Sequence, residues 1–298
     1  MNKSRILYLF TRTPLHVGAG ASVGAIDQPI QRERHTGFPI IPASSLKGSF
    51  ADHWNDTLVK GKRAEGAAAW LFGSDDDKAA FTGALQFGEA RLLAFPIRSA
   101  KGSFAWITCP LMLQRAVRDG VIPSVLIEKL PEPKDEEAIF DTGAASKLAL
   151  SSQVVLEEYT FKSANNWAGL AKLGDALAAL LPGDPVWAEI KDRLVILSNG
   201  MMSFFAQNAC EVAQHVRISD ETGTAEPGAL FNQENVPSET LFYAVMHATS
   251  GRLKTGDHAG KKAEDALNAF EAKIKETGVF QFGGDASTGL GYCTVKLG

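Results

Sequence analysis

The sequence predicts an α+β protein with an antiparallel sheet. Segments with the residue types of strands are interleaved with segments whose apolar residues recur at helical spacing. The chain shows no long series of strand–helix–strand units, which would indicate a parallel sheet, and no strand-rich pattern typical of a sandwich. With 298 residues, 45% of them apolar, it is long enough for one large domain or two ordinary ones with a sizeable core.

The amino-terminal elements follow from periodicity and turn residues. Ile6–Phe10 has the apolar run of a buried strand. Residues 13–43 contain too many glycines and prolines for a regular element, and a loop of this length is either functional or disordered. Helical spacing then predicts a helix with Ser44 and Ser45 as N-cap candidates, and a short helix over 65–72 before an acidic turn at 74–78.

The middle of the chain is expected to continue this mixture of strands and helices. Residues 121–143 hold three prolines and a charge cluster, which predicts an inserted loop. Strands are predicted at 83–99 (with hairpin character), 104–110, 154–161 and 194–198, and helices at 111–118, 166–181, 185–192 and 201–215.

The carboxyl-terminal part is expected to hold a hairpin and a final pair of strands. Residues 216–246 have strand-like arms around the turn signal Asp220–Gly223, which predicts a long hairpin-like excursion. A charged helix over 261–275 comes next. Two strands, 279–284 and 290–297, are then joined by the glycine-rich loop GGDASTGLG.

Composition and charge narrow the class of protein. The net charge of −4 argues against a protein that coats nucleic acid without specificity, but residues 1–63 carry nine basic and four acidic residues, a net +5. This asymmetry fits one face for a polyanion, and ordinary surface scatter explains it equally well. Three separated cysteines indicate neither a zinc site nor disulfides, and the absence of a signal or membrane segment leads us to expect a cytoplasmic protein with no membrane partner.

The stretch HVGAGASVGAIDQPIQRERHTGFP carries the residues most suited to chemistry. Asp27 is the only carboxylate between Thr11 and Gln31, among glycines that allow close backbone approach. An Asx turn explains such a residue. The functional alternative is a base or metal ligand acting on an anionic substrate that Arg32, Arg34 and His35 hold.

Two further segments could contact phosphate groups. Lys47 lies near the predicted start of a helix, where backbone N–H groups favour an anion, although a solvated lysine is the simpler interpretation. The loop Gly283–Gly291 could cradle phosphates through its N–H groups, but it fits a plain hairpin turn and matches no nucleotide-binding fingerprint. Signatures of conventional enzyme families are absent from the sequence.

Several motifs together resemble one family. LHVGAG, GAIDQPIQRERHTGFPIIPASSLKGSF, GALQF, VPSETLFYAV and GGDASTGLGYCTV resemble the backbone RAMP subunit of type III-B CRISPR effector complexes, the Cmr module. The resemblance covers nearly the full chain and weakens between about Val121 and Ser198. It implies a single RAMP domain over 1–298, with a modified ferredoxin-like palm of the RNA-recognition-motif type, fingers inserted at about 120–165 and a thumb β-hairpin at about 216–246.

The resemblance also implies an assembly and a reaction. Copies of the subunit would stack as a filament along a CRISPR guide RNA, with other Cmr subunits, and cleave complementary target RNA at regular intervals. Asp27 falls on the catalytic position, where its carboxylate would assist the target 2′-hydroxyl in attacking the adjacent phosphate, directly or through Mg²⁺ or Mn²⁺ bound only in the RNA complex.

The remaining site residues are implied in the same way. Glu239 and Tyr243 are secondary candidates for the active site. RNA-binding roles are implied for His16, Arg32, Arg34, His35, Lys47, Gly283, Gly284, Gly289 and Gly291. Two other functions stay open: a subunit that binds and positions the guide without cutting, and a guide-processing endoribonuclease with His35 as its acid or base.

Overall fold

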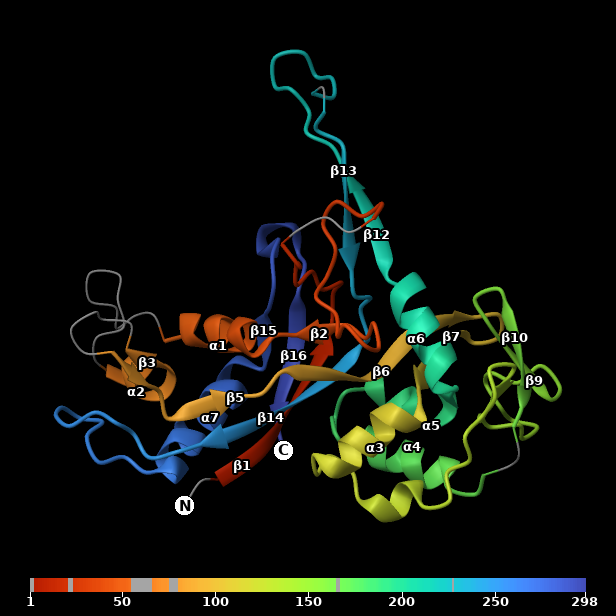
Figure 1. The fold of residues 1–298 in the computed structure, drawn as a ribbon, viewed down its shortest axis with the longest axis horizontal. Coiled ribbons are helices and arrows are strands. Elements are labelled where there is room, and N and C mark those ends of the chain that lie inside the picture. Colours follow the sequence, from red (N-terminus) through yellow and green to blue (C-terminus); the bar gives the residue numbers. More distant parts are fainter. Residues whose placement is uncertain (1–2, 21–23, 55–65, 75–79, 165–166, 227) are drawn as a thin grey trace.

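A large, mostly antiparallel sheet runs through the molecule, and one long hairpin projects from it (Figure 1). The computed structural model describes residues 3–20, 24–54, 66–74, 80–164, 167–226 and 228–298. It confirms the α+β class and the antiparallel sheet that the sequence predicts. Most of the predicted acidic turn, together with Glu65 and Asn166, lies outside the described residues.

Strand β1 (Lys3–Thr11) is an interior strand of the sheet. It pairs in antiparallel fashion with β14 (Leu241–Ala248) on one side and β16 (Tyr292–Leu297) on the other. The last five residues of β1 are all buried. Because successive side chains of a strand point to opposite faces, Leu7 and Leu9 enter one core while Tyr8 and Phe10 enter a second. The sheet is therefore covered on both faces at this point.

The other strands extend the sheet beyond β14 and β16. Its order is β15, β16, β1, β14, β6, β9, β10 and β8. The added strands are β15 (Val279–Gln281), β6 (Ala90–Ser99), β9 (Gln153–Leu156), β10 (Tyr159–Ser163) and β8 (Glu137–Ala138). Shorter pairings involve β7 (Ser103–Thr108), β11 (Leu194–Ile196), β2 (Ile40–Ile41) and β5 (Leu85–Phe87), and β3 (Gly73–Ser74) pairs with β4 (Phe81–Thr82). Only β8 with β10 and β7 with β11 are parallel among these described strands.

Helices supply the rest of both cores. In the first core, the ring of Phe50 lies 5.0 Å from that of Phe270. In the second core, Trp187 lies 5.4 Å from Trp106 and 5.3 Å from Phe10. The helices are α1 (Ala43–Asp52), α2 (Gly66–Phe72), α3 (Pro110–Arg118), α4 (Leu170–Ala178), α5 (Ile190–Arg193), α6 (Asn199–Asn208) and α7 (Ala263–Thr277), with short 3₁₀ turns η2 (Ser124–Ile127), η3 (Trp187–Glu189) and η4 (Ala286–Thr288). Over the described ranges, no helix is long and apolar enough to cross a membrane.

The first predicted helix and one predicted strand have wrong boundaries. Ser44 and Ser45 lie inside α1, because the helix begins after Pro42, whose carbonyl accepts the N–H of Leu46. The strand predicted over 154–161 is a hairpin, β9 and β10, that turns at Glu157 with a positive φ of 50°. A single strand pattern did not reveal this turn, since Glu is an unusual residue in that conformation.

The hairpin begins earlier than the sequence predicts. The helix expected over 201–215 ends at Asn208, and Glu211–His215 forms strand β12, which pairs with β13 (Phe231–Asn235). The residues after Asn208 do not alternate as in a half-buried strand, and pairing with β13 determines the outcome. Residues 241–246 of the expected excursion belong to the central strand β14. The projecting part is thus β12, β13 and the segment between them (Figure 1).

Candidate functional site

The glycine-rich loop that follows β1 is attached to the base of the hairpin. Bridges join Leu15 to Val236 and Gln28 to Gln233, and a third bridge closes the loop between Gly18 and Ile30. The described residues of the loop therefore form an irregular layer against β13. Among these residues, the absence of a regular element predicted for 13–43 holds up to Pro39, whereas Ile40 and Ile41 form the short strand β2 and Ala43 begins α1.

Asp27 is held by Asn232 of β13. One carboxylate oxygen of Asp27, Oδ2, accepts the backbone N–H of Asn232 at 2.8 Å, and the backbone N–H of Asp27 donates to Oδ1 of Asn232 at 2.8 Å. The side-chain amide of Asn232 also donates to the carbonyl of Ala25. The local Asx turn considered from the sequence is not what orients this carboxylate, because its partner lies 205 positions away along the chain.

The side chain of Asp27 borders a small pocket. It is exposed, and it lines a cavity of about 340 Å³ with His16, Gly18, Gly20, Gln28 and Pro29. The pocket combines one carboxylate, one imidazole and glycines without side chains, so another molecule can come close to the Asp27 oxygens.

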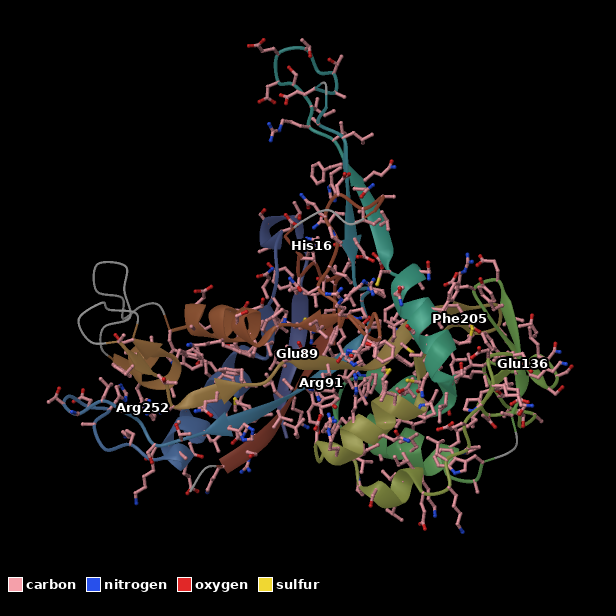
Figure 2. All side chains as sticks on the ribbon, in the orientation of Figure 1. His16, Glu89, Arg91, Glu136, Phe205 and Arg252 are labelled. Carbon is pink, nitrogen blue, oxygen red and sulfur yellow. The ribbon has the colours of Figure 1, made fainter. Side chains whose placement is uncertain are left out.

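His16 is buried and has a defined orientation. Its Nδ1 lies 2.7 Å from the carbonyl oxygen of Glu234, and since a carbonyl only accepts, Nδ1 carries the hydrogen. In the neutral ring, Nε2 is then the acceptor. This nitrogen faces Gly18, where an added Cβ would lie only 2.9 Å from Nε2. Figure 2 shows His16 beside the hairpin, away from Glu89 and Arg91.

Arg32 and Glu234 form a largely buried ion pair behind the pocket. Their side chains are 19% and 9% exposed, and Nη2 of Arg32 lies 2.6 Å from Oε1 of Glu234. Glu234 also accepts the N–H of Ile30, and Arg32 donates to the carbonyls of Gly37 and Ala206. Arg32 therefore connects the loop, the hairpin and α6, a role that its place beside Asp27 in the sequence did not indicate.

Arg34 and His35 lie on another side of the loop. Both are exposed and line a hollow of about 470 Å³ together with Arg115 and Arg118 of α3. Arg115 donates to both carboxylate oxygens of Glu33 at 2.9–3.0 Å and lies 3.1 Å from Nε2 of His35. Burial would raise the pKa of Glu33, but hydrogen bonds from Thr36 and Arg115 hold that pKa below its usual value.

Three of the four predicted carboxyl-terminal glycines pack on the backbone of the same loop. The N–H of Gly284 donates to the carbonyl of His16 at 2.9 Å, and a Cβ on Gly283 would lie 2.0 Å from that carbonyl oxygen. The N–H of Gly291 donates to Pro14, whereas Gly289 is exposed with a φ of 89°. Gly283 and Gly284 are thus next to His16, which lines the Asp27 pocket.

Three further predicted site residues do not line the pocket either. Lys47 lies within α1, is half-buried and makes no hydrogen bond or ion pair with any residue that the structure describes. Tyr243 is buried on β14 and donates to Asp119, and burial followed by this contact raises its pKa. Glu239 precedes β14, and burial, followed by the charge of Asp184, raises its pKa to about 6.

The described residues do not form a metal site by themselves. No group of three or more His, Cys, Asp or Glu side chains in the described part of the chain is placed to hold a metal ion. Asp27 offers one exposed carboxylate in a glycine-lined pocket, and this fits Mg²⁺, which often takes one or two carboxylates and completes its shell with substrate phosphates and water.

Sequence reasoning missed the two residues that orient the site from the hairpin. Asn232 and Glu234 lie more than 200 positions from the loop and belong to the polar segment FNQEN. The only signal was the presence of consecutive polar residues in a predicted strand arm, and this could not identify their partners.

Known proteins share both the sequence and the fold. The family model of the RAMP superfamily matches residues 9–294. The chain is 34% identical over 297 residues to the CRISPR system Cmr endoribonuclease Cmr4 of Pyrococcus furiosus, which covers 99% of this chain and 96% of that protein. It is 30% identical over 147 residues, 42% of this chain and 67% of the relative, to the Cms endoribonuclease Csm3 of Streptococcus thermophilus.

A solved structure of a Cmr4 protein has a similar fold. The crystal structure of oligomeric Cmr4 from Pyrococcus furiosus superimposes with a TM-score of 0.70 at 27% identity, over 99% of this chain and 97% of that one. The sequence and the fold therefore place this chain beside the same proteins.

Proposed function

The chain belongs to the RAMP superfamily, in the family of Cmr4, and we propose that it is a backbone subunit of a type III-B CRISPR effector complex that binds guide RNA and cleaves complementary target RNA. The observation that carries the proposal is Asp27, an exposed carboxylate oriented by β13 in a glycine-lined pocket. We further propose that the subunit assembles with copies of itself and with other Cmr subunits, in the cytoplasm.

The arrangement of the sheet and the hairpin supports an assignment of the expected parts of a RAMP subunit. We assign the sheet around β1, β14 and β6 to a ferredoxin-like palm, and the hairpin of β12 and β13 to the thumb. The inserted fingers would include β8, β9 and β10. The Asp27 pocket lies where the palm meets the thumb, so a strand of RNA pushed aside by the hairpin would pass close to it.

The proposed reaction is a transesterification in the target strand. The 2′-oxygen of one nucleotide attacks the adjacent phosphorus while Asp27 accepts the 2′-hydroxyl proton. The bond to the 5′-oxygen of the next nucleotide breaks, and that oxygen leaves with a proton from solvent. The products are a 2′,3′-cyclic phosphate and a 5′-hydroxyl.

Asp27 is suited to this role by its contacts. Its Oδ2 is engaged by the N–H of Asn232, and its Oδ1 has no hydrogen-bond donor in the described part of the chain. A divalent metal held by Asp27 and RNA phosphates would supply Lewis-acid stabilisation of the charge that develops on the phosphate. His16, with its Nε2 lone pair beside the pocket, would contact RNA and is not assigned a proton-transfer step.

The guide-processing alternative has less support from the geometry. His35 lies in the hollow beside Arg115 and Glu33, and it is not among the residues that line the Asp27 pocket. A histidine acting as general base would need the reacting hydroxyl within hydrogen-bond reach.

The proposed function is tested with a complex assembled from the full-length chain, its partner subunits and a defined guide RNA. A labelled complementary RNA should be cut at constant spacing and leave cyclic-phosphate ends, whereas a non-complementary RNA of equal length should stay intact. Cleavage of both RNAs alike, or of neither, would contradict the proposal.

A further inference from the structure

A second, arginine-rich concavity lies on another side of the glycine-rich loop from the Asp27 pocket. We call it the arginine hollow and define it by Arg34, His35, Glu89, Arg91, Arg115 and Arg118. Its residues come from three separate parts of the chain: the glycine-rich loop, the start of β6 and the helix α3. Its volume is about 470 Å³.

Buried ion pairs fix the walls of the hollow. Arg115 and Glu33, whose side chains are 14% and 8% exposed, join α3 to the loop. Asp119 accepts from Arg91 at 3.2 Å and from the hydroxyl of Tyr243 at 2.9 Å, which joins α3 to β6 and β14. Arg115 and Arg91 are thus held in place before any ligand arrives, which reduces the entropy that these two side chains lose on binding.

The hollow keeps donors that its own carboxylates do not use. Arg34 is exposed and forms no ion pair with the described residues, and the side chain of Arg118 is 62% exposed. Arg91 uses Nη1 for Asp119, its Nη2 has no acceptor within the described ranges, and its side chain is 34% exposed. A ligand rich in oxygen acceptors would satisfy these donors, and planar guanidinium groups suit phosphate oxygens in particular.

We propose that the arginine hollow binds a phosphate group of the RNA backbone, with Arg34, Arg91 and Arg118 as its ligands. This inference rests on the proposed function, because that function makes RNA the available polyanion. The hollow and the Asp27 pocket share one structural support: Arg32 lines the hollow, and it pairs with Glu234, whose carbonyl accepts from His16 of the pocket. An RNA strand held in the hollow is therefore positioned by the same loop that carries Asp27.

Glu89 allows a test in which a substitution should strengthen RNA binding. It lines the hollow and makes no hydrogen bond with the residues that the structure describes. Burial, followed by the charge of Glu33, raises the pKa of Glu89, although the charges of Arg91 and Arg115 act in the opposite direction. A phosphate in the hollow would be repelled by this carboxylate, so Glu89 weakens the binding that the arginines favour.

The test compares three variants of the full-length chain. Arg118→Gln removes a ligand, Glu89→Gln removes the opposing charge, and Arg98→Gln is the matched control, since Arg98 is 66% exposed and pairs with Glu157 and Glu158 away from the hollow. One arm measures binding of a labelled single-stranded RNA to the isolated chain. The other measures binding of complementary RNA to the guide-loaded complex. Both are repeated at several salt concentrations.

The expected changes have opposite signs. Arg118→Gln should weaken binding roughly tenfold and reduce the slope of log affinity against log salt by about 0.7, the value for one phosphate contact on a single strand. Glu89→Gln should tighten the same binding several-fold, which a misfolded protein cannot do. If binding to the isolated chain changes, the phosphate belongs to the guide RNA. If only binding of complementary RNA to the guide-loaded complex changes, it belongs to the target RNA.

Two results would overturn the proposal. In the first, both variants match Arg98→Gln in both arms. In the second, RNA binding is unchanged while assembly of the complex weakens, which would make the hollow a contact for an acidic protein surface. Failure of target cleavage with intact Arg118-dependent RNA binding would instead contradict only the proposed function.

Discussion

Asp27 and Asn232 hold each other through two reciprocal hydrogen bonds of 2.8 Å, one from each backbone N–H to the other side chain. This pairing joins the glycine-rich loop to the hairpin strand β13. The position of the proposed catalytic carboxylate is therefore determined by the hairpin as much as by the loop.

Asn232→Ala should impair cleavage more than RNA binding. The substitution removes the acceptor for the Asp27 N–H and the donor to Ala25, but it keeps the backbone N–H that binds the Asp27 carboxylate. We expect target cleavage to fall roughly tenfold, the effect of about 1.4 kcal/mol in positioning, while guide affinity changes by less than about twofold. Asn208→Ala, which removes a single hydrogen bond at the end of α6, is the control. Equal cleavage rates in the two variants would contradict a positioning role for Asn232.

Gly18→Ala should displace the His16 ring. A Cβ at residue 18 would lie 2.9 Å from Nε2 of His16, closer than real contacts allow. We expect a loss of about 1–2 kcal/mol in the free energy of unfolding, measured by denaturant titration, and a shifted imidazole resonance. Gly48→Ala is the matched control, since residue 48 lies in α1 with open space around it, and alanine should stabilise the helix by about 0.5–1 kcal/mol. If Gly18→Ala is as stable as Gly48→Ala, His16 is not tightly placed.

Arg32→Leu should destabilise the fold strongly. It leaves the Glu234 carboxylate, 9% exposed, without its ionic partner, and breaking a buried pair in this way costs about 3–5 kcal/mol. Arg98→Leu removes two ion pairs, with Glu157 and Glu158, from an exposed arginine and should cost less than about 1 kcal/mol. Thermal or urea unfolding distinguishes the two. Similar losses for both variants would show that Arg32 acts mainly at the surface, as an RNA ligand.

Glu239→Gln should stabilise the protein at neutral pH. The pKa of Glu239 is raised to about 6 in the fold, so the folded state binds more protons than the unfolded state between pH 4.5 and 6, and stability falls as the pH rises through that range. Removing the charge should therefore add about 1 kcal/mol at pH 7.5, a value reduced for the partial exposure of the group, and nothing below pH 4. A gain that is the same at both pH values would show that ionisation of Glu239 is not its cause.

The sequence predicted the parts of this site that are close together in the chain. The glycines and prolines of segment 13–43 predicted that most of it would be irregular. Asp27 was identified as a candidate because acidic residues are scarce in that segment. The role of Asn232 could not be predicted, because it depends on a pairing across 205 positions. Likewise, periodicity could not show that Arg32 would be buried on Glu234, or that Arg115 and Arg118 of α3 would meet Arg34.

The central claim, that Asp27 performs target cleavage, is tested most directly by Asp27→Asn in an assembled, guide-loaded complex. Asparagine keeps the size of the side chain and an oxygen that can accept the Asn232 N–H, but it cannot act as a base. We predict that complementary target RNA binds with unchanged affinity and that cleavage at the regular positions falls by at least about 100-fold. Cleavage at the wild-type rate and spacing would contradict the account.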